Sequence, residues 1–278
     1  DPVLIRGDGS YLYTLCSVLD DIDLGMTDII RGEDHTSNTA TQIQLFEALA
    51  AMKGLSDFSL PRFAHMPLVT GADGSKLSKS NGALSIRDLR EDGGLEPLTI
   101  VTFLSRLGTP DGPQPVSAID ELAGSFDIAR FGRSSPRMDP DELVPLNGKI
   151  VRQLPYAAVE GRFEGLNETR WAVIQPNLER LGDVADWLRL IEGPVTPVIE
   201  DAAFAATAAG LLPEGALDAD SWSAWTDAVK AETGAKGRGL FMPLRQALTG
   251  QERGPEMAVL LPLLDRDKIL ARLRGEAA

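Results

Sequence analysis

The segment GADGSKLSKSNGALS, residues 71–85, places two lysines, Lys76 and Lys79, among glycines and serines. Glycine tolerates backbone angles that other residues avoid, so such a loop can shape itself around a ligand. Two ammonium groups with hydroxyl and backbone N–H donors suit an anion, most naturally a chain of phosphates. From these residues alone, a solvated surface turn explains the segment equally well.

A second polar segment, RGEDH at residues 31–35, follows a short apolar run that predicts a strand over 28–30. Apolar residues at helical spacing then predict a helix, with Ser37 or Asn38 as its N-cap. The segment FAHMPLVT, residues 63–70, predicts another buried strand, and the lysine loop comes directly after it. This order is typical of a parallel α/β sheet, in which ligands bind beyond the carboxyl ends of the strands. Both polar segments fall at such ends.

The remainder of the chain predicts mainly helices. The first fifteen residues read as a strand, a Gly-Asp-Gly turn and a second extended piece. After residue 85, helical patterns punctuated by proline and glycine dominate, so the second half is predicted to be all-α. Four tryptophans in these helices are predicted to pack in the core rather than stack on bases: Trp171, Trp187, Trp222 and Trp225.

The composition is that of an acidic globular protein of 278 residues, with a formal net charge of -14 and a pI near 4.6. This charge argues against broad, nonspecific nucleic-acid binding, although basic residues gather at 236–253 and 266–274. The single cysteine, Cys16, excludes an internal disulfide framework and fits a reducing compartment, so the cytoplasm is the predicted location. No apolar run reaches the roughly 20 residues that span a bilayer, and no membrane partner is expected.

Three acids, Asp20, Asp21 and Asp23, could be taken for a metal cluster. They fall on a helix-like stretch away from the lysine loop, and Mg²⁺ sites generally depend on substrate phosphates as well as carboxylates. A solvated or RNA-facing acidic helix is the better interpretation. One cysteine and two histidines are also too few for a typical structural zinc site, so no residue is predicted to be a metal ligand.

Three motifs in this order and spacing resemble the bacterial class I glutamyl-tRNA synthetases. They are the stretch from YLYTL to NTATQ at residues 11–42, FAHMPLV with KLSKS at 63–80, and LFMPLRQALTG at 240–250. KLSKS resembles the second signature of class I synthetases, and the last motif resembles a segment of the anticodon domain. The resemblance implies an α/β fold, the second half of a Rossmann-like catalytic domain, followed by an all-α anticodon-binding domain.

The chain departs from the family in one large respect. The His-Ile-Gly-His signature and the insertion that grips the tRNA acceptor end do not occur in it. The resemblance therefore implies a C-terminal portion of a synthetase. The implied division is residues 1–75 for the second half of the catalytic domain, 76–145 for the KLSKS loop and a helical stem-contact domain, and 146–278 for the anticodon-binding domain.

The resemblance implies ATP, bound with Mg²⁺, as a substrate. Lys76 and Lys79 are the residues expected to act in catalysis, by stabilising the charge that grows on the triphosphate. Ser78 would add a hydrogen bond to the phosphates. His35 stands where the family has a residue near the adenosine, and Leu68 and Val69 would offer backbone groups to adenine. Asp34 would orient the ribose or a loop, although a role as N-cap of the next helix fits it almost as well.

For glutamate, the resemblance implies Arg31, Tyr13 and Ser17. A planar guanidinium at Arg31 can hold the γ-carboxylate with two hydrogen bonds and reject glutamine. The structural alternative is a strand-end arginine paired with Glu33 or Asp34. Tyr13 could equally pack in the core, and some relatives have Asn where Ser17 stands.

The expected macromolecular partner is tRNA(Glu), with tRNA(Gln) as a second candidate, and the protein is expected to be a monomer. Lys236, Arg238 and Arg245 are predicted to contact the tRNA, whereas Leu240, Leu244 and Leu248 recur at helical spacing and are predicted to pack in the core. In the family an arginine helps to read the last anticodon base, and Asn177 or a neighbour stands near that place.

Three functions remain open at this point. The first is a glutamate–tRNA ligase whose C-terminal portion is inactive alone. The second is a tRNA-binding fragment or truncated paralogue without catalytic activity. The third is an unrelated nucleotide-binding α/β enzyme in which KLSKS is coincidental, against which the anticodon-like helices weigh.

Overall fold

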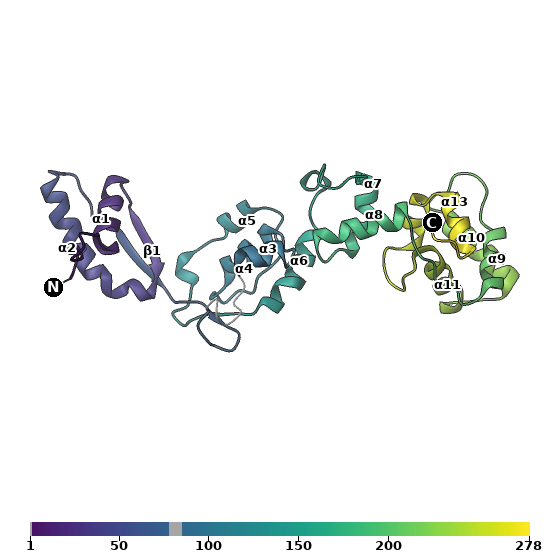
Figure 1. Ribbon diagram of the computed structural model, residues 1–278, viewed down its shortest axis with the longest axis horizontal. Helices are drawn as coiled ribbons and strands as arrows, with labels where there is room; N and C mark the ends of the chain where they lie inside the picture. Colours follow the sequence, from purple (N-terminus) through teal and green to yellow (C-terminus); the bar gives the residue numbers. More distant parts are fainter. Residues whose placement is uncertain (1, 78–84) are drawn as a thin grey trace. The chain divides into compact units, whose positions relative to one another are not determined.

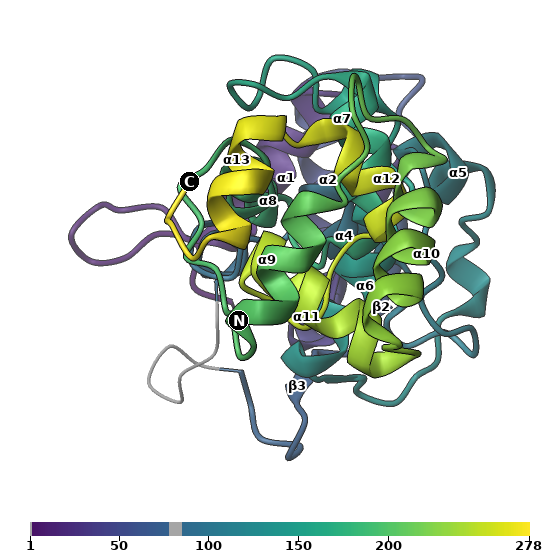
Figure 2. The same ribbon diagram turned by 90° about the vertical axis from the view of Figure 1, so that its right-hand side faces the viewer.

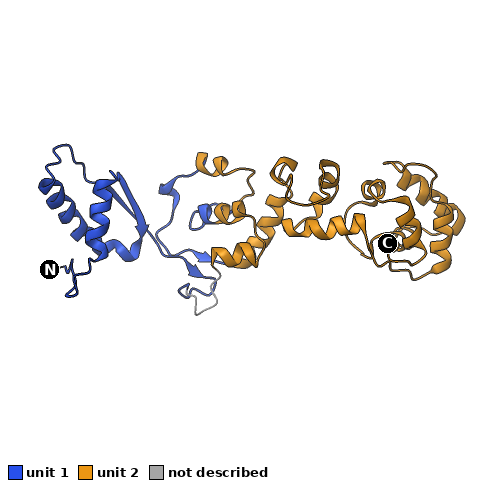
Figure 3. Ribbon diagram, turned by 45° about the horizontal axis from the view of Figure 1, so that its top comes forward, with its two compact units in different colours: residues 1–83, 104–113, 125–139 blue, residues 84–103, 114–124, 140–278 orange. Residues whose placement is uncertain are grey.

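The structure is a computed structural model that describes residues 2–77 and 85–278. The chain forms two compact units, coloured separately in Figure 3. Unit 1 contains residues 1–83, 104–113 and 125–139, and unit 2 contains residues 84–103, 114–124 and 140–278. The three-domain division expected from the sequence stays a prediction.

Unit 1 is built on a strand–helix–strand arrangement, visible in Figure 1. Its elements are α1 (Tyr13–Asp23), β1 (Asp28–Gly32), α2 (Thr36–Met52), β2 (Arg62–Met66), β3 (Thr70–Gly71) and β4 (Arg137–Met138). Strands β1 and β2 pair in parallel, with Arg31 opposite His65, and β3 pairs in parallel with β4. The parallel α/β arrangement expected from the sequence is confirmed.

The hydrophobic core of this unit forms where α1 and α2 pack on the strands. Val18 of α1 and Phe46 of α2 are fully buried. The Phe46 ring stacks on Phe58 and meets Phe63 of β2 edge-on, with ring centroids 6.0 and 6.3 Å apart. This packing of apolar residues fixes the two helices beside the strands, and it thereby positions the polar side chains described below.

The N-terminal stretch only partly forms the expected hairpin. Ile5 and Tyr11 make an antiparallel bridge, and the Asp8 carboxylate accepts hydrogen bonds from the Ser10 backbone N–H and hydroxyl. The second extended piece is short, because α1 already begins at Tyr13.

Unit 2 is helical, as predicted. Its helices are α3 (Ile86–Glu91), the first part of α4 (Pro97–Arg106), α5 (Ile119–Gly124), α6 (Leu143–Val151), α7 (Glu168–Ile174), α8 (Val184–Glu192), α9 (Ala202–Gly210), α10 (Ser221–Thr233), α11 (Arg238–Thr249), α12 (Met257–Leu260) and α13 (Arg266–Leu273). Figure 2 shows α9, α10, α11 and α13 gathered side by side. None of the helices in the described part of the chain combines the length and apolarity needed to cross a membrane.

The core of unit 2 confirms two predictions. Leu240, Leu244 and Leu248 are buried on one face of α11. Trp171 and Trp225 are buried, and their indole N–H groups donate to backbone carbonyl oxygens at 3.2 and 2.8 Å. Trp187 and Trp222 pack against the same cluster. These indoles are therefore core residues.

A buried amide joins three segments of this unit. Asn147 of α6 is fully buried, and its Oδ1 accepts hydrogen bonds from Glu96 N and Thr99 Oγ1 at 2.8 and 2.9 Å. Its Nδ2 donates to the Glu179 carbonyl oxygen at 2.7 Å. One side chain thus bonds the buried Thr99 hydroxyl and two part-buried backbone groups.

Candidate functional site

Arg31 is the centre of a polar network in unit 1. It lies near the carboxyl end of β1, and its guanidinium stands 5.8 Å from the ring centroid of Phe63, the residue two positions before its strand partner His65. A guanidinium over an aromatic face is stabilised by the ring quadrupole. Arg31 is half-buried, so it can hold fixed partners on one side and still meet solvent on the other.

Four side chains accept hydrogen bonds from this guanidinium. Its Nη2 donates to Thr39 Oγ1 at 2.8 Å and to Gln42 Oε1 at 2.5 Å. Its Nε donates to His65 Nε2 at 3.4 Å, and its Nη1 donates to the Tyr13 hydroxyl at 3.4 Å. The alternative expected from the sequence, an ion pair with Glu33 or Asp34, does not occur among these described residues.

Two further predicted residues join this network. Ser17 of α1 accepts a hydrogen bond from Gln42 Nε2 at 2.8 Å. The His35 ring lies 5.1 Å from the Tyr13 ring, and its Nδ1 is 3.2 Å from Asn38 Nδ2. The structure therefore brings together Tyr13, Ser17, Arg31 and His35, although His35 was expected near the adenosine rather than in the glutamate group.

The network also contains three residues that were not expected from the sequence, which are Thr39, Gln42 and His65. Thr39 and Gln42 are three residues apart, so they share one face of α2. A polar pair on the face that packs on a strand is the signal that could have revealed them. His65 could have been found from the parallel register, which places it opposite Arg31.

The pKa of one acid of α1, Asp21, is influenced by the charge of Arg31. Burial raises the pKa of Asp21 above its usual value, while the positive charge of Arg31 partly opposes that rise. Another acid, Asp23, forms an ion pair with Lys53. The described part of the chain contains no group of three His, Cys, Asp or Glu side chains placed to hold a metal ion.

The start of α2 differs from the prediction. The helix begins at Thr36 with His35 at the N-cap and without a side-chain cap, after a short 3₁₀ turn over Glu33–His35. Neither Ser37 nor Asn38 caps it, and the capping role considered for Asp34 is also wrong. The Thr36 hydroxyl instead donates to the Glu33 carbonyl oxygen at 2.7 Å, so the preceding 3₁₀ turn already shapes the helix start.

The lysine loop is described as far as Leu77. Gly74 adopts φ +82° and its N–H donates to the Gly71 carbonyl oxygen, while the Ser75 N–H donates to the Asp73 carboxylate at 2.9 Å. The hydrogen bonds from Ser75 lower the pKa of Asp73. Lys76 follows this tight turn and is exposed. Ser78 and Lys79 lie outside the described residues.

The base of this loop is joined to a distant segment of the same unit. The Thr70 N–H and hydroxyl both donate to the Pro136 carbonyl oxygen, at 2.9 and 3.2 Å. Thr70 then pairs with Arg137 in the β3–β4 ladder. The turn that presents Lys76 is therefore held by residues that no motif marked.

A cleft of about 460 Å³ lies at the carboxyl ends of β1 and β2. Its lining includes Glu33, Thr36, His65, Met66, Pro67, Phe131 and Arg133. Leu68 and Val69 follow directly in the chain, and Leu68 is exposed. A Cβ on Gly32 would stand 2.5 Å from the Asp34 carboxylate and 3.1 Å from Leu68 Cδ2, so glycine permits this close approach. The position of the cleft agrees with ligand binding beyond parallel strands.

In unit 2, the basic residues expected to meet RNA divide into two groups. Lys236 and Arg238 are exposed, and Arg238 forms a long ion pair of 3.9 Å with Glu252. Arg245 is half-buried, and its Nη2 donates to the Pro255 carbonyl oxygen at 2.8 Å, while burial lowers its pKa. Arg245 thus contributes to the structure of the loop that follows α11.

The basic stretch 266–274 is largely structural. Arg272 is fully buried and donates to the carbonyl oxygens of Ala278 and Leu248 at 2.7 and 2.8 Å. Arg266 donates to the carbonyl oxygens of Leu212 and Pro213. The basic residues that gather at 266–274 therefore include two arginines whose charged groups serve internal carbonyls.

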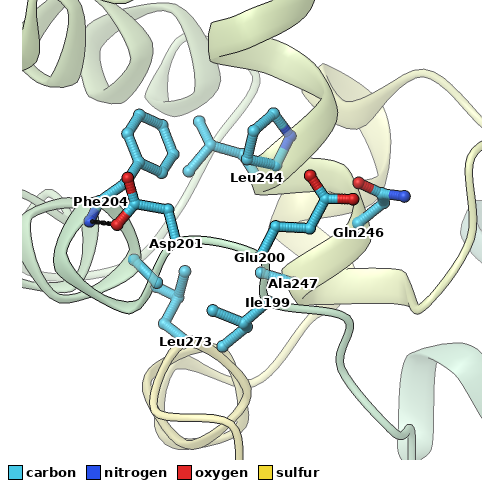
Figure 4. Close-up of a pocket in the computed structure, with 10 residues that line it drawn as sticks. Ile199, Glu200, Asp201, Phe204, Leu244, Gln246, Ala247 and Leu273 are labelled. Atoms are coloured by element: carbon cyan, nitrogen blue, oxygen red, sulfur yellow. Dashed lines mark hydrogen bonds between the residues drawn. The ribbon is translucent and has the colours of Figure 1, made fainter.

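A small apolar hollow between α9, α11 and α13 is shown in Figure 4. Phe204, Leu244 and Leu273 line it, together with Asp201. The Asp201 carboxylate accepts hydrogen bonds from Ala203 N and Phe204 N, so it is the N-cap of α9. The residues of this hollow are explained by packing and capping.

Two protein families match the sequence. The family described as tRNA synthetases class I (E and Q), catalytic domain, matches residues 1–144. The family described as anticodon binding domain matches residues 152–276. Together the two matches confirm the predicted fold class, a catalytic α/β portion followed by a helical anticodon-binding domain.

Curated relatives match over the whole chain. Glutamate–tRNA ligase 1 of Maricaulis maris is 51% identical over 282 residues, which cover 100% of this chain and 62% of that protein. Glutamate–tRNA ligase 2 of Methylorubrum populi is 50% identical, with the same coverage of each chain. The chain thus spans about 62% of the length of these relatives.

Solved structures share the fold. The glutamate–tRNA synthetase of Elizabethkingia anophelis superposes with a TM-score of 0.75 at 20% identity, covering 98% of this chain and 61% of that one. At this level of identity the likeness concerns the fold.

Proposed function

Because the chain belongs to the family of class I tRNA synthetases (E and Q), we propose that it is the C-terminal portion of a glutamate–tRNA ligase. The observation that carries the proposal is the Arg31 network. It presents a guanidinium, fixed by Thr39 and Gln42, near the carboxyl end of a parallel strand. A fixed guanidinium in such a place is suited to bind a carboxylate ligand.

The proposed reaction has two steps. A glutamate carboxylate oxygen attacks the α-phosphorus of ATP, and pyrophosphate leaves. A hydroxyl of the terminal tRNA ribose then attacks the glutamyl carbonyl carbon, and AMP leaves. Negative charge grows on the phosphates in the first step, so positioned cations and N–H donors accelerate it.

The roles of individual residues follow from this reaction. Arg31 and Tyr13 bind the side-chain carboxylate of glutamate, with Ser17 behind them. Lys76 and Lys79 bind the phosphates of ATP, with Ser78 beside them, and the backbone of Leu68 and Val69 meets the adenine. His35 also contacts the adenosine.

We further propose that Mg²⁺ enters with ATP, coordinated by its phosphates, which is how this ion is usually held at nucleotide sites. Asp23 is paired with Lys53, and the positive charge of Arg31 acts on Asp21, so two of the three acids of α1 already have cationic neighbours. The bound ion would neutralise charge on the phosphates. The residues of this chain would position the nucleotide beside the glutamate.

The helical unit 2 supports a role in tRNA binding, for which Lys236 and Arg238 are the exposed candidates. We propose tRNA(Glu) as the partner, with tRNA(Gln) as the second candidate because Asn177 stands near the position of a discriminating arginine. A monomer in the cytoplasm fits this function.

The test uses a chimaera in which this chain replaces the matching 62% of the Maricaulis maris relative. The chimaera is expected to attach labelled glutamate to tRNA(Glu). Arg31→Ala should lower kcat/KM for glutamate by about 100-fold or more, since it removes a charge-assisted contact with the substrate. Arg62→Ala is the matched control, because Arg62 lies on the neighbouring strand, is exposed and pairs with Asp28.

Two results would contradict the proposal. A correctly folded chimaera that attaches no glutamate would refute the ligase function of this chain. Equal losses in Arg31→Ala and Arg62→Ala would remove Arg31 from the glutamate site. The isolated 278-residue chain is expected to bind tRNA without charging it, and charging by this chain alone would mean that the active site has been misplaced.

A further inference from the structure

The donors of Arg31 are not equally available to a ligand. Both N–H groups of Nη2 are used by Thr39 and Gln42, and the Nε–H is used by His65. Nη1 donates one hydrogen to the Tyr13 hydroxyl, and its second hydrogen has no acceptor among residues 2–77 and 85–278. A ligand therefore meets Nη1, while Nη2 is held by the protein.

The amide of Gln42 is oriented by a directional chain of hydrogen bonds. Gln42 is only 1% exposed, so both ends of its amide need partners. Its Nε2 donates to Ser17 Oγ, and the Ser17 hydroxyl donates onward to the Thr14 carbonyl oxygen at 3.4 Å. Because the Ser17 hydroxyl proton is donated to the Thr14 carbonyl oxygen, Ser17 Oγ acts as the acceptor for Gln42 Nε2. This leaves Gln42 Oε1 facing Arg31.

We propose that Gln42 is a positioning residue that turns Nη1 of Arg31 toward the substrate and thereby selects a carboxylate over a carboxamide. This inference rests on the proposed function, since it concerns the same glutamate site. The Tyr13 hydroxyl accepts from Nη1, so its own proton is free to point to the ligand. Tyr13 is half exposed, which leaves the hydroxyl accessible to a ligand.

The selectivity follows from counting donors. The remaining N–H of Nη1 and the Tyr13 O–H are both donors, and two carboxylate oxygens can accept both. Where the two donors face the two terminal atoms of the ligand side by side, a carboxamide presents its oxygen to one and its NH₂ group to the other, so one donor would face another donor. A site built in this way rejects the amide because a polar group is left unpaired. The second hydrogen bond to the ligand thus comes from Tyr13, rather than from Nη2.

The test measures selectivity in the chimaera described above. Gln42→Leu removes the amide at similar volume, and it should raise KM for glutamate about tenfold or more while kcat changes less than about threefold. The ratio of kcat/KM for glutamate over glutamine should fall about tenfold. Gln44→Leu is the matched control on the same helix, because Gln44 is exposed, and it should change neither quantity.

A second variant guards against misfolding. Gln42→Glu keeps the size of the side chain but places a carboxylate beside Nη2, so it should lower the same selectivity ratio by neutralising Arg31. Circular dichroism and thermal unfolding establish that each variant is folded. A purely structural role would lower activity with both amino acids equally and leave the ratio unchanged, and that result in either folded variant would overturn the proposal.

A measurement that does not depend on the reaction separates this inference from the proposed function. In NMR spectra of the 278-residue chain, hydrogen exchange of the Arg31 guanidinium should become about tenfold faster in Gln42→Leu. Unchanged exchange would mean that Gln42 does not hold Arg31. If exchange accelerates but the unsubstituted chimaera charges no glutamate, the positioning role stands and the ligase proposal fails.

Discussion

The exposed cations at the start of α11 allow a quantitative test of RNA binding. Lys236 and Arg238 are exposed, the Arg238 side chain to 79%, and the Glu252 carboxylate at 3.9 Å holds Arg238 weakly. If each residue neutralises one phosphate, each contributes about 0.7 to the slope of log K against log salt on single-stranded RNA. The double variant Lys236→Glu/Arg238→Glu should therefore flatten this slope by about 1.4.

The assay is fluorescence anisotropy of labelled tRNA(Glu) with the 278-residue chain, at several salt concentrations. Single variants should each change the slope by about half as much as the double variant. Arg189→Glu is the matched control, because Arg189 is an exposed arginine of unit 2 that pairs with Asp186 three residues away. An unchanged slope in the folded double variant would show that this surface does not meet phosphates, and it would redirect the search to residues 170–177.

Three further predictions concern single side chains. Lys79→Ala in the chimaera should slow adenylate formation by about 100-fold or more with tRNA affinity unchanged, and charging at the normal rate would mean that KLSKS does not bind the phosphates. Asn147→Ala should lower the free energy of unfolding by about 2 kcal/mol in urea titrations, because it leaves the buried Thr99 hydroxyl and two part-buried backbone groups without this partner, whereas a loss below about 1 kcal/mol would contradict this account. Burial raises the pKa of Asp21 in the folded chain, so its contribution to stability grows as the pH falls through that raised value and is lost as the pH rises. Asp21→Asn should therefore stabilise the chain more at pH 7 than at pH 4, and equal effects at both pH values would count against a raised pKa.

The backbone plan of unit 1 could be predicted from local patterns. The apolar run at 28–30 and the segment FAHMPLVT marked β1 and β2, because short apolar runs are typical of parallel strands. The expectation that the second strand is buried and extends to residue 70 was wrong, since β2 ends at Met66 and its residues are only partly covered or exposed. Their order with α2 between them then fixed the parallel pairing. In unit 2, leucines repeating every four residues identified the buried face of α11 for the same reason of periodicity.

The side-chain partners were harder to predict, because they depend on tertiary contacts. Gln42 looks like an ordinary helix residue until α1 places Ser17 against it. Arg272 looks like a surface cation until the chain around Leu248 and Ala278 covers it. A sequence shows the charge of an arginine but not whether carbonyl oxygens or water surround its guanidinium.

The start of α2 was mispredicted for a local reason. Serine and asparagine are strong N-caps in general, which favoured Ser37 and Asn38. The preceding 3₁₀ turn over Glu33–His35 instead leads directly into the helix, and the Thr36 hydroxyl bonds to the turn itself. A cap preference could not anticipate that the turn continues into helical geometry.

The parallel register of β1 and β2 has a consequence for which length changes the chain can tolerate. Arg31 meets Phe63 and His65 because neighbouring strands are aligned and successive side chains alternate between two faces. One residue inserted within β2 would move His65 out of alignment and turn the following side chains to the opposite face. The same insertion between α2 and β2, at residues 53–61, would only lengthen a loop, at small entropic cost. Natural length variation near this site is therefore expected to collect in that loop and to spare both strands.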